Sequence, residues 1–378
     1  MRKVQKAVAV MLLVFICALS VAGWLTPDRT FSPEENRMLD PKPKFSLHGL
    51  TSGKIIVDYE KYVSDQFPFR DFWIGVHSDM GRALGQKESN GVYLGQDGYL
   101  IQQFQPPAKG RVEENAEAIR KFAAASPNLQ IYVMLAPTSF TLNKEKLPAF
   151  APVGDELASL KQMRDALGNA IKLVDVYPAL SANRQEYLYY RTDHHWTTLG
   201  AYYAYRELCK QMGIVPQAKN EFELRRVTDQ FYGSLYSKSG FKHLQPDEIE
   251  LWLPKVEERV SVEYADEQHS TESLYAMENL NAKDKYAVFL NGNHGFVKIT
   301  SNQAARKKLL IVKDSYANSL IPFLTKHFSE IDIVDLRYYD GNLSALIRDQ
   351  KIRDVLVLYN INTFFTDPSI QNLSEMIE

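Results

Sequence analysis

Asp193, His194, His195 and Trp196 follow one another in the middle of the chain and bring together side chains suited to acid–base chemistry. If this segment is extended, side chains two positions apart point the same way, so Asp193 and His195 share one face while His194 takes the other. A carboxylate so placed can orient an imidazole. Hydrolases and acyl transferases use such a pair to activate a serine, because a serine hydroxyl is unreactive until a neighbouring base takes its proton.

Two other interpretations of this motif remain open. Histidine and aromatic residues are common in protein cores, and Thr197 or Thr198 could simply cap the helix predicted to follow. Alternatively, Asp193 and the two histidines, together with His294 or Asp314, could bind zinc or manganese through nitrogen and oxygen. Adjacent histidines in an extended segment point apart, however, and the sequence has no His-x-Glu or His-x₃-His pattern.

Ser315 is the candidate nucleophile, because it follows a short apolar run, residues 309–312, that is predicted to be a strand. In open parallel α/β sheets, ligands bind beyond the carboxyl ends of the strands. A helix that begins at Ser315 would offer backbone N–H groups and a positive dipole end to a developing oxyanion. The simpler interpretation is that Asp314 or Ser315 only caps this helix. No Gly-x-Ser-x-Gly elbow surrounds Ser315.

The run 189–200 resembles the signature from which the DHHW protein family takes its name. It is also similar to the Asp-x-His-Trp motif of SGNH-hydrolase-like acetyltransferases that O-acetylate bacterial exopolysaccharides such as alginate. Four further stretches resemble DHHW-family segments, namely residues 32–37, 65–70, 90–100 and 231–240. The resemblance implies that Ser315 is the nucleophile, His195 the base and Asp193 its orienting partner, since the family's serine follows a strand after the Asp-x-His pair.

Further residues are predicted to face the substrate. They include Trp196 and Tyr316, each next to a residue of the proposed triad. Thr138 and Asn360 follow predicted strands at their carboxyl ends and could contact substrate or oxyanion, although each could equally be a turn residue. The serines and tyrosines of residues 231–240 suit polysaccharide hydroxyls, or they form a structural loop. No cofactor and no metal are predicted.

Composition narrows the class of protein. The chain has 378 residues, 45% of them hydrophobic, which is enough for one large or two modest domains with a full core. Its 44 basic and 46 acidic residues give a net charge of −2, so there is no overall basic field for nucleic acid. Of the two cysteines, Cys17 lies in the N-terminal apolar run, which leaves Cys209 without a partner for an intramolecular disulfide.

Residues 1–25 are predicted to be a membrane anchor or a signal peptide. Three basic residues precede the uncharged run 7–25, which is about as long as the ~20 residues that a bilayer core requires. Basic residues before such a run place the N-terminus in the cytoplasm, so everything after Thr26 is expected outside it, in the cell envelope. Ser20 and Ala22 would suit a signal-peptidase site, and cleavage therefore stays open.

The remaining chain is predicted to be α/β. Residues 26–53 are rich in proline and charge and indicate a linker, and the catalytic domain is predicted to span residues 54–378. The expected strands are residues 130–135, 171–176, 309–312, 331–334 and 355–358, and the expected helices include residues 112–125, 155–167 and 197–212, with two more between 54 and 84 that are broken at Pro68. This alternation predicts a parallel sheet covered on both faces. Residues 213–302 alternate polar and apolar and predict a β-rich insertion. The resemblance implies the SGNH-hydrolase-like, flavodoxin-like three-layer sandwich.

The function expected from these features is that of an extracytoplasmic O-acyltransferase, in the first place an O-acetyltransferase, that acts on an exopolysaccharide or cell-wall polymer and is anchored to the cytoplasmic membrane. In the resembling systems a multi-spanning membrane acyltransferase supplies the acetyl group across the membrane, and the resemblance implies such a partner. Two alternatives remain. The same triad could serve a carbohydrate esterase that uses water as acceptor, or the chain could be a catalytically silent polysaccharide-binding or assembly protein.

Overall fold

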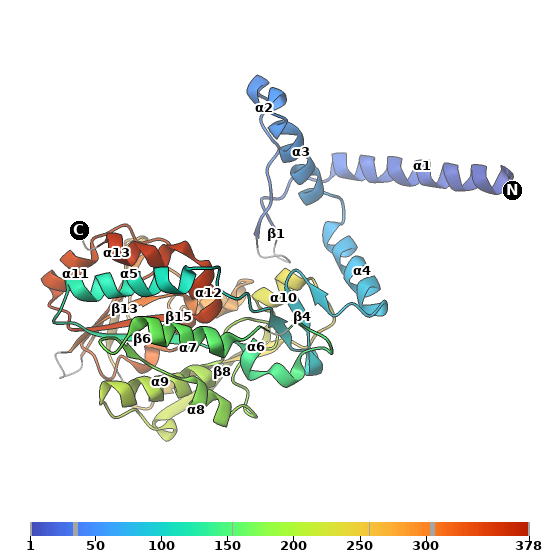
Figure 1. The fold of residues 1–378 in the computed structure, drawn as a ribbon. Coiled ribbons are helices and arrows are strands. Elements are labelled where there is room, and N and C mark those ends of the chain that lie inside the picture. Colours follow the sequence, from blue (N-terminus) through green and yellow to red (C-terminus); the bar gives the residue numbers. More distant parts are fainter. Residues whose placement is uncertain (1, 33–36, 153, 257, 303–306, 377–378) are drawn as a thin grey trace. The chain divides into compact units, whose positions relative to one another are not determined.

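The computed structural model describes residues 2–32, 37–152, 154–256, 258–302 and 307–376 (Figure 1). The chain divides into two compact units, of which the smaller comprises residues 1–89 and 237–243 and the larger comprises residues 90–236 and 244–378. The catalytic domain was predicted to begin at residue 54, whereas the larger unit begins at Asn90. The helices between these positions belong to the smaller unit, together with the N-terminal segment.

The smaller unit is helical. Its elements include α1 (Arg2–Leu25), β1 (Phe31–Ser32), β2 (Arg37–Met38), α2 (Leu47–Thr51), α3 (Lys54–Asp65), α4 (Arg70–Ala83) and β3 (Glu88–Ser89). By length and composition α1 could cross a membrane, and it is the one described helix of which this is true. The helices α3 and α4 are separate, as predicted. Pro68 lies between them and cannot extend α3, because proline has no backbone N–H to donate and its ring clashes with the preceding turn.

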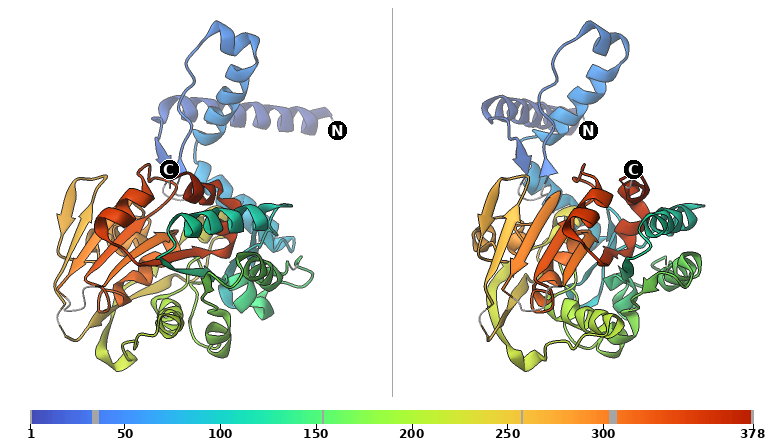
Figure 2. Two further views of the ribbon diagram at one scale, coloured as in Figure 1. Left: turned by 60° about the vertical axis from the view of Figure 1, so that its left-hand side comes forward. Right: turned by 90° about the vertical axis from the view of Figure 1, so that its left-hand side faces the viewer.

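The larger unit is built on an eight-stranded sheet with the order β11-β10-β12-β14-β13-β15-β6-β7 (Figure 2). The strands are β6 (Gln130–Ala136), β7 (Lys172–Leu173), β10 (Val260–Tyr264), β11 (His269–Thr271), β12 (Phe296–Ser301), β13 (Lys308–Lys313), β14 (Glu330–Val334) and β15 (Asp354–Asn360). From β14 to β7 neighbouring strands are parallel, whereas β12, β10 and β11 continue the sheet antiparallel. The sheet is therefore mixed, and the predicted parallel arrangement is confirmed for one part of it.

The predicted insertion is β-rich, but it divides in two. The strands β8 (Phe222–Phe231) and β9 (Asp247–Pro254) pair with each other as a separate antiparallel hairpin. Strands β10 to β12 instead extend the main sheet, because β12 pairs with β14. Polar and apolar alternation indicates an antiparallel strand with one buried face, but it does not say which neighbour that strand pairs with.

Helices and turns cover both faces of the sheet (Figure 2). On one face lie α9 (Thr198–Met212) and the turns η6 (Ser315–Ser319) and η7 (Ile321–Phe323), and on the other lie α5 (Arg111–Ala125), α7 (Glu156–Leu167), α11 (Leu343–Gln350), α12 (Ile361–Thr366) and α13 (Asn372–Glu375). Alternate residues of β13 divide between the two cores, since Leu309 and Ile311 face the first and Leu310 and Val312 the second. This is the layering of a three-layer α/β fold. The unit also contains β4 (Val92–Leu94) and β5 (Leu100–Gln102), which pair antiparallel. It further contains α6 (Ser139–Leu142), α8 (Tyr177–Ala182) and the start of α10 (Ser234–Ser239).

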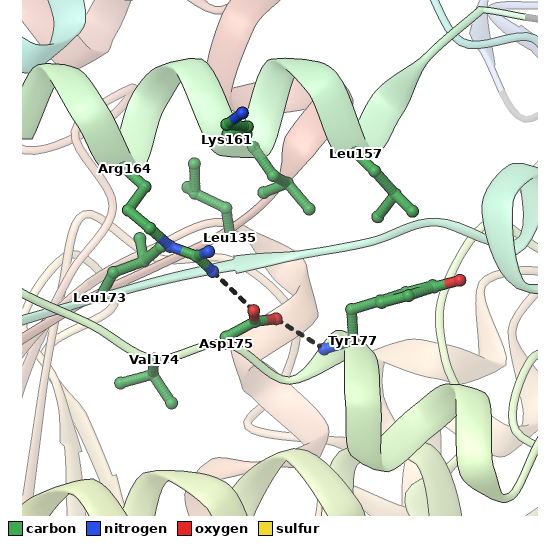
Figure 3. Close-up of a pocket in the computed structure, with 9 residues that line it drawn as sticks. Leu135, Leu157, Lys161, Arg164, Leu173, Val174, Asp175 and Tyr177 are labelled. Carbon is green, nitrogen blue, oxygen red and sulfur yellow. Dashed lines mark hydrogen bonds and ion pairs between the residues drawn. The ribbon is translucent and has the colours of Figure 1, made fainter.

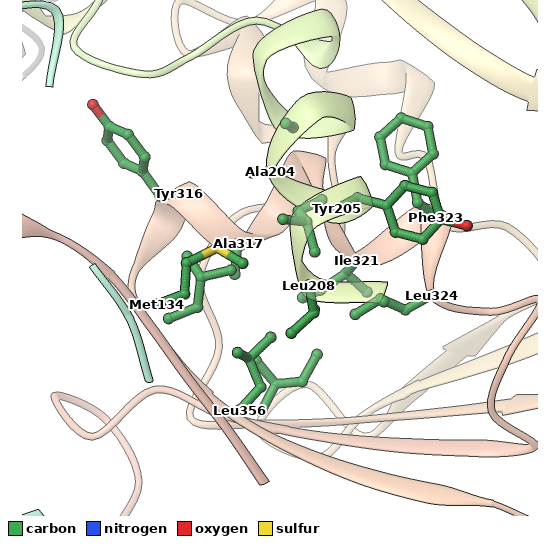
Figure 4. Close-up of a cluster of buried hydrophobic side chains, with 14 of the residues drawn as sticks. Met134, Ala204, Tyr205, Leu208, Tyr316, Ala317, Ile321, Phe323, Leu324 and Leu356 are labelled. Carbon is green, nitrogen blue, oxygen red and sulfur yellow. The ribbon is translucent and has the colours of Figure 1, made fainter. Parts of the chain in front are cut away.

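A cluster of buried side chains joins α9 to the turns that follow β13 (Figure 4). Ala204 and Leu208 of α9 lie in one core with Ile321 and Leu324, above Met134 and Leu356 of the sheet. The helix α9 follows directly on the Asp-His-His-Trp motif, and η6 begins with Ser315. Hydrophobic packing therefore brings together two segments that are far apart in the sequence.

Truncating this cluster is expected to destabilise the larger unit. Leu208 is fully buried, so Leu208→Ala should lower the free energy of unfolding by about 2–5 kcal/mol, through lost burial and the cavity that is left behind. Denaturant unfolding measures the loss. Val215→Ala changes a side chain that is 86% exposed and serves as the control, with an expected change within about 0.5 kcal/mol. Equal effects of the two substitutions would contradict this account of the core.

Candidate active site

Asp193, His195 and Ser315 form one hydrogen-bonded chain. His195 Nε2 lies 2.7 Å from Ser315 Oγ, and His195 Nδ1 lies 2.5 Å from Asp193 Oδ1. The imidazole is therefore placed to accept the serine proton through Nε2 while Nδ1–H donates to the carboxylate. Both distances are those of hydrogen bonds, so the three residues predicted to form a triad lie together. The catalytic roles of the three residues stay a prediction.

The segment that carries the motif is a tight turn, so the extended conformation considered from the sequence does not form. Tyr189 and Trp196 pair across it in an antiparallel bridge, and the Tyr190 N–H donates to the His195 carbonyl at 3.3 Å. Asp193 Oδ1 also accepts the backbone N–H of His195 at 2.9 Å, which closes the turn on itself. As a result the two histidine rings do not point apart, and their centroids lie 3.8 Å from each other.

Asp193 is held as a buried, ionised carboxylate. Its Oδ2 accepts the backbone N–H of Ser234 at 2.7 Å, and the Ser234 hydroxyl lies 2.6 Å from His194 Nδ1. Burial by itself would raise the pKa of Asp193, but the two imidazoles and the hydrogen bonds to the carboxylate outweigh burial and hold the pKa well below its usual range. Asp193 therefore stays charged at any pH at which the protein works, as the partner of an imidazolium must.

Tyr286 stacks on the His195 ring, and no pattern in the sequence pointed to it. The two rings are nearly parallel, with an interplanar angle of 9° and centroids 3.7 Å apart. The Tyr286 hydroxyl lies 3.2 Å from the Ser315 carbonyl oxygen and 3.1 Å from Ser319 Oγ. Tyr286 comes from the predicted insertion, so this part of the chain positions both His195 and the turn that carries Ser315.

Ser315 follows the carboxyl end of a strand, as predicted. This strand, β13, is an inner strand of the sheet, between β14 and β15. The helix expected there is a five-residue 3-10 turn, η6, which cannot provide the dipole of an α-helix. Asp314 caps this turn, because its Oδ1 accepts the Tyr316 N–H at 2.9 Å. Burial raises the pKa of Asp314 to about 6. The capping interpretation therefore applies to Asp314, and Ser315 remains partly exposed between buried neighbours.

Lys313 places a buried ammonium group two residues before Ser315. Its Nζ donates to Asn293 Oδ1 at 2.7 Å and to Asn318 Oδ1 at 2.8 Å, and it lies 3.9 Å from a carboxylate oxygen of Asp335. Burial lowers the pKa of Lys313 to about 8, so the group is still mostly protonated at neutral pH. The turn with Ser315 is therefore bonded, through Asn318, to a buried ammonium group that Asp335 partly balances.

Trp196 and Tyr316, which were predicted to face the substrate, have fully buried side chains in this structure. The Trp196 indole N–H donates to the Tyr316 carbonyl at 3.0 Å, and the Tyr316 hydroxyl donates to the His194 carbonyl. The pair links the histidine turn to the serine turn in both directions. Large side chains next to a motif are as easily explained by this anchoring as by substrate contact.

Thr138 and Asn360 lie at carboxyl ends of strands, as predicted, but their polar groups are engaged inside the protein. Asn360 donates from both its backbone N–H and its Nδ2 to Asp314 Oδ2, at 2.9 and 2.6 Å. Thr138 donates its backbone N–H to Glu156 at 2.6 Å and its hydroxyl to the same carboxylate at 3.1 Å. Both therefore act as turn residues in this structure, the interpretation that the sequence left open.

Three of the residues considered as metal ligands do lie close together. Ligand atoms of Asp193, His194 and His195 lie within 4.8 Å of one another. His195 Nδ1 and Nε2, however, are hydrogen-bonded to Asp193 and Ser315, so His195 could bind a metal ion only if one of these bonds opened. His294, considered as a further ligand, bonds to Asp266 and to the Asn291 carbonyl instead. The observed hydrogen bonds are those of a triad.

A pocket of about 160 Å³ lies at the β7 edge of the sheet (Figure 3). Arg164 and Asp175 form an ion pair of 2.6 Å beside it, and the Tyr177 ring faces it. Its lining does not include the proposed triad, so the pocket is separate from the chemistry described above.

Residues 125–334 match the DHHW protein family. The match spans more than half of the 378 residues, and the chain belongs to this family. A solved DHHW family protein from Eubacterium siraeum is similar, with a TM-score of 0.67 and 25% sequence identity over 75% of this chain and 96% of that one. Bacillus cereus PatB1, solved with a sulfonyl adduct, has a TM-score of 0.61 and 19% identity over 75% of this chain and 99% of its own, which shows a shared fold. A comparison with curated proteins finds no match.

Gly233 leaves the space that Asp193 occupies. A Cβ at this position would lie 2.2 Å from the Asp193 Cβ and 2.4 Å from its Oδ2. Gly233→Ala should therefore displace the carboxylate and lower the rate at which a sulfonyl fluoride modifies Ser315 by about 10²-fold, the cost of a misplacement of about 1 Å. Gly75→Ala, in helix α4 with its nearest neighbour 4.0 Å away, is the control. An unchanged rate for Gly233→Ala would show that the position of Asp193 does not matter.

Glu156 is expected to make stability depend on pH. Burial raises its pKa from 4.5 to about 7 although three hydrogen bonds oppose the shift. Its contribution is therefore fully present below pH 4.5 and is lost as the pH rises to about 7. Urea unfolding should show the wild type losing about 3 kcal/mol over this range relative to Glu156→Gln, which does not titrate. Parallel curves for the two proteins would contradict the shift.

Proposed function

We propose that this protein is an extracytoplasmic, SGNH-like O-acyltransferase that transfers an acyl group, in the first place acetyl, to a hydroxyl of an exopolysaccharide or cell-wall polymer. The observation that carries the proposal is the chain from Asp193 through His195 to Ser315, with bonds of 2.5 and 2.7 Å. The sulfonyl adduct of PatB1 supports it, because such an adduct forms when an activated nucleophile attacks an electrophilic sulfonyl group.

The reaction would proceed in two steps. Ser315 Oγ attacks the carbonyl carbon of the acyl donor while His195 Nε2 takes the serine proton, and the donor's leaving group departs with that proton. The acyl group is then an ester on Ser315. In the second step a sugar hydroxyl attacks this ester as His195 takes its proton, and Ser315 leaves with the proton returned from His195.

The surroundings of His195 suit this role. Ionised Asp193 fixes the tautomer with a proton on Nδ1 and stabilises the imidazolium that forms in each step. The stacked Tyr286 ring limits rotation of the imidazole. Because both act through His195, they are positioning residues.

Charge around Ser315 favours the tetrahedral intermediates. Each intermediate carries a negative oxygen, and preorganised positive groups in a site that excludes water stabilise such an oxygen. The buried Lys313 ammonium supplies positive charge next to the turn that begins at Ser315, where it donates to Asn318 Oδ1 of η6 and is partly balanced by Asp335.

The place of action and the partners follow from α1 and from the family resemblance. With α1 in the cytoplasmic membrane, the larger unit would lie outside the cytoplasm. The acyl group would then have to be supplied across the membrane, and the resemblance adds a multi-spanning membrane acyltransferase as its source. The acceptor would be a polysaccharide in the cell envelope.

An esterase with the same triad differs only in its acceptor, since water would attack the acyl-serine. A catalytically silent binding or assembly protein would differ more, because its Ser315 would not react. Reactivity of Ser315 therefore separates the enzymes from the silent protein, and the fate of the acyl group separates transfer from hydrolysis.

Serine-directed labelling tests the first point. A fluorophosphonate should modify Ser315 in the wild type, and Ser315→Ala and His195→Ala should each abolish the labelling. Ser273→Ala, which removes an exposed hydroxyl elsewhere, should label normally. Folding of each variant is checked by thermal unfolding. A folded wild-type protein that does not react would leave the silent protein as the explanation.

Acyl transfer tests the second point. With an activated acetyl ester and an oligosaccharide acceptor, mass spectrometry should detect the acetylated sugar, and free acetate alone would indicate an esterase. Ser315→Ala and His195→Ala should each lower the rate by about 10⁶-fold, and the double variant should be scarcely slower, because triad members act as a unit. Asp193→Asn should cost less, about 10⁴-fold, since the nucleophile and base remain.

A further inference from the structure

The helices α3 and α4 each expose an apolar face. On α3 it consists of Ile56, Tyr59 and Val63, which are spaced three, four and seven residues apart and are 44–64% exposed. On α4 it is formed by Phe72 and Met80, with Phe69 just before the helix, and the three side chains are 61–69% exposed. Soluble proteins rarely expose apolar surface in contiguous patches of this kind unless something covers them.

The polar side of the same helices is tied to the segment that leaves α1. The Tyr62 hydroxyl donates to Asp28 at 2.9 Å. Gln66 exchanges two hydrogen bonds of 2.9 Å with the backbone of Arg29, whose guanidinium pairs with Asp71 at 2.9 Å. Asp65, on the side of α3 opposite Ile56, is buried and accepts two hydrogen bonds from Arg37. Because these hydrogen bonds hold the polar side of the two helices against Asp28, Arg29 and Arg37, the apolar faces must point away from these residues.

This attachment keeps the junction of α3 and α4 close to the end of α1. Asp28 follows Leu25, the last residue of α1, by three residues, which span at most about 10 Å. Direct contacts agree, since Gly23 of α1 lies against Pro68, so that a Cβ there would be 3.4 Å from the proline ring. The Trp73 ring of α4 meets Phe15 of α1 edge-on, with centroids 6.3 Å apart. Phe15 lies ten residues, about 15 Å, before the end of α1, so the Trp73 side chain would reach into the acyl chains while Pro68 stays near the end of α1.

The chemistry of the two helices fits a membrane surface. Between residues 54 and 83 there are four basic and five acidic residues, so attraction to anionic lipid is not the driving force. Aromatic side chains are frequent, and aromatic residues concentrate at membrane–water interfaces. Amphipathic helices with one apolar face bind there by burying that face at the boundary of headgroups and acyl chains.

From these observations we propose that α3 and α4 form a helix pair that lies in the membrane–water interface beside α1, on the extracytoplasmic side, with the Ile56 and Phe72 faces in contact with lipid. The proposal rests on the anchor included in the proposed function. It adds a second attachment to the bilayer, one that holds the chain against the surface instead of leaving it on a flexible linker. The covering partner is lipid, not a second protein.

Spin labels on the full-length protein in lipid nanodiscs test this. The background is Cys17→Ala, in which the remaining native cysteine, Cys209, is buried. One introduced cysteine then carries a nitroxide at residue 56, 63, 72 or 80, at residue 61 on the polar side of α3, at residue 14 within α1, or at residue 215 in the larger unit. Collisions with dissolved oxygen report lipid, and collisions with a water-soluble nickel complex report water. Labels at residues 56, 63, 72 and 80 should favour oxygen, whereas those at residues 61 and 215 should favour nickel. The result should be the same in zwitterionic and anionic lipid.

The label at residue 14 separates the two claims. If it favours oxygen while the helix-pair labels favour nickel, the anchor stands and the interfacial pair is overturned. If residue 14 favours nickel, the anchor itself is wrong. Protection of the helix-pair labels from both reagents would indicate burial against protein, in this preparation a second copy of the chain, and would also overturn the proposal.

Discussion

The site depends on a reciprocal bond between two turns that lie about 120 residues apart in the sequence. Trp196 donates its indole N–H to the Tyr316 carbonyl, and Tyr316 donates its hydroxyl to the His194 carbonyl. Both side chains are fully buried, so neither hydrogen bond can be exchanged for water without cost. Because each of these residues adjoins a member of the proposed triad, the pair sets the distance between His195 and Ser315.

Two buried charged groups, one negative and one positive, lie near the two turns that this pair of hydrogen bonds joins. Asp193 is buried, ionised and bonded to His195, and the Lys313 ammonium is buried and donates to Asn318 of the turn that begins at Ser315. An isolated charge in such surroundings would be costly, but each is surrounded by hydrogen-bonding groups. The same preorganised charges can stabilise an imidazolium and an oxyanion with little reorganisation during a reaction.

Residues 213–302, which were predicted to be an insertion, supply several of the contacts that hold the candidate site. It supplies Tyr286, which stacks on His195, and Ser234, whose backbone N–H holds Asp193. Gly233 makes room for that carboxylate. Residues outside the recognisable motif therefore decide how the motif is oriented, which explains why the motif alone does not establish activity.

The sequence by itself determined the elements that have strong local signals. The apolar runs of β6, β13, β14 and β15, the periodicity of α5, α7 and α9, and the three residues of the proposed triad were all predicted from it. Register, sheet neighbours and turn geometry were decided by tertiary contacts. Burial patterns could not show that β12 joins β14, that residues 190–195 turn back on themselves, or that Ser315 opens a 3-10 turn instead of an α-helix. The roles of Tyr286, Trp196 and Tyr316 likewise exist only through contacts with distant residues, because the partner that a side chain meets is set by the packing of the whole fold and not by its neighbours in the chain.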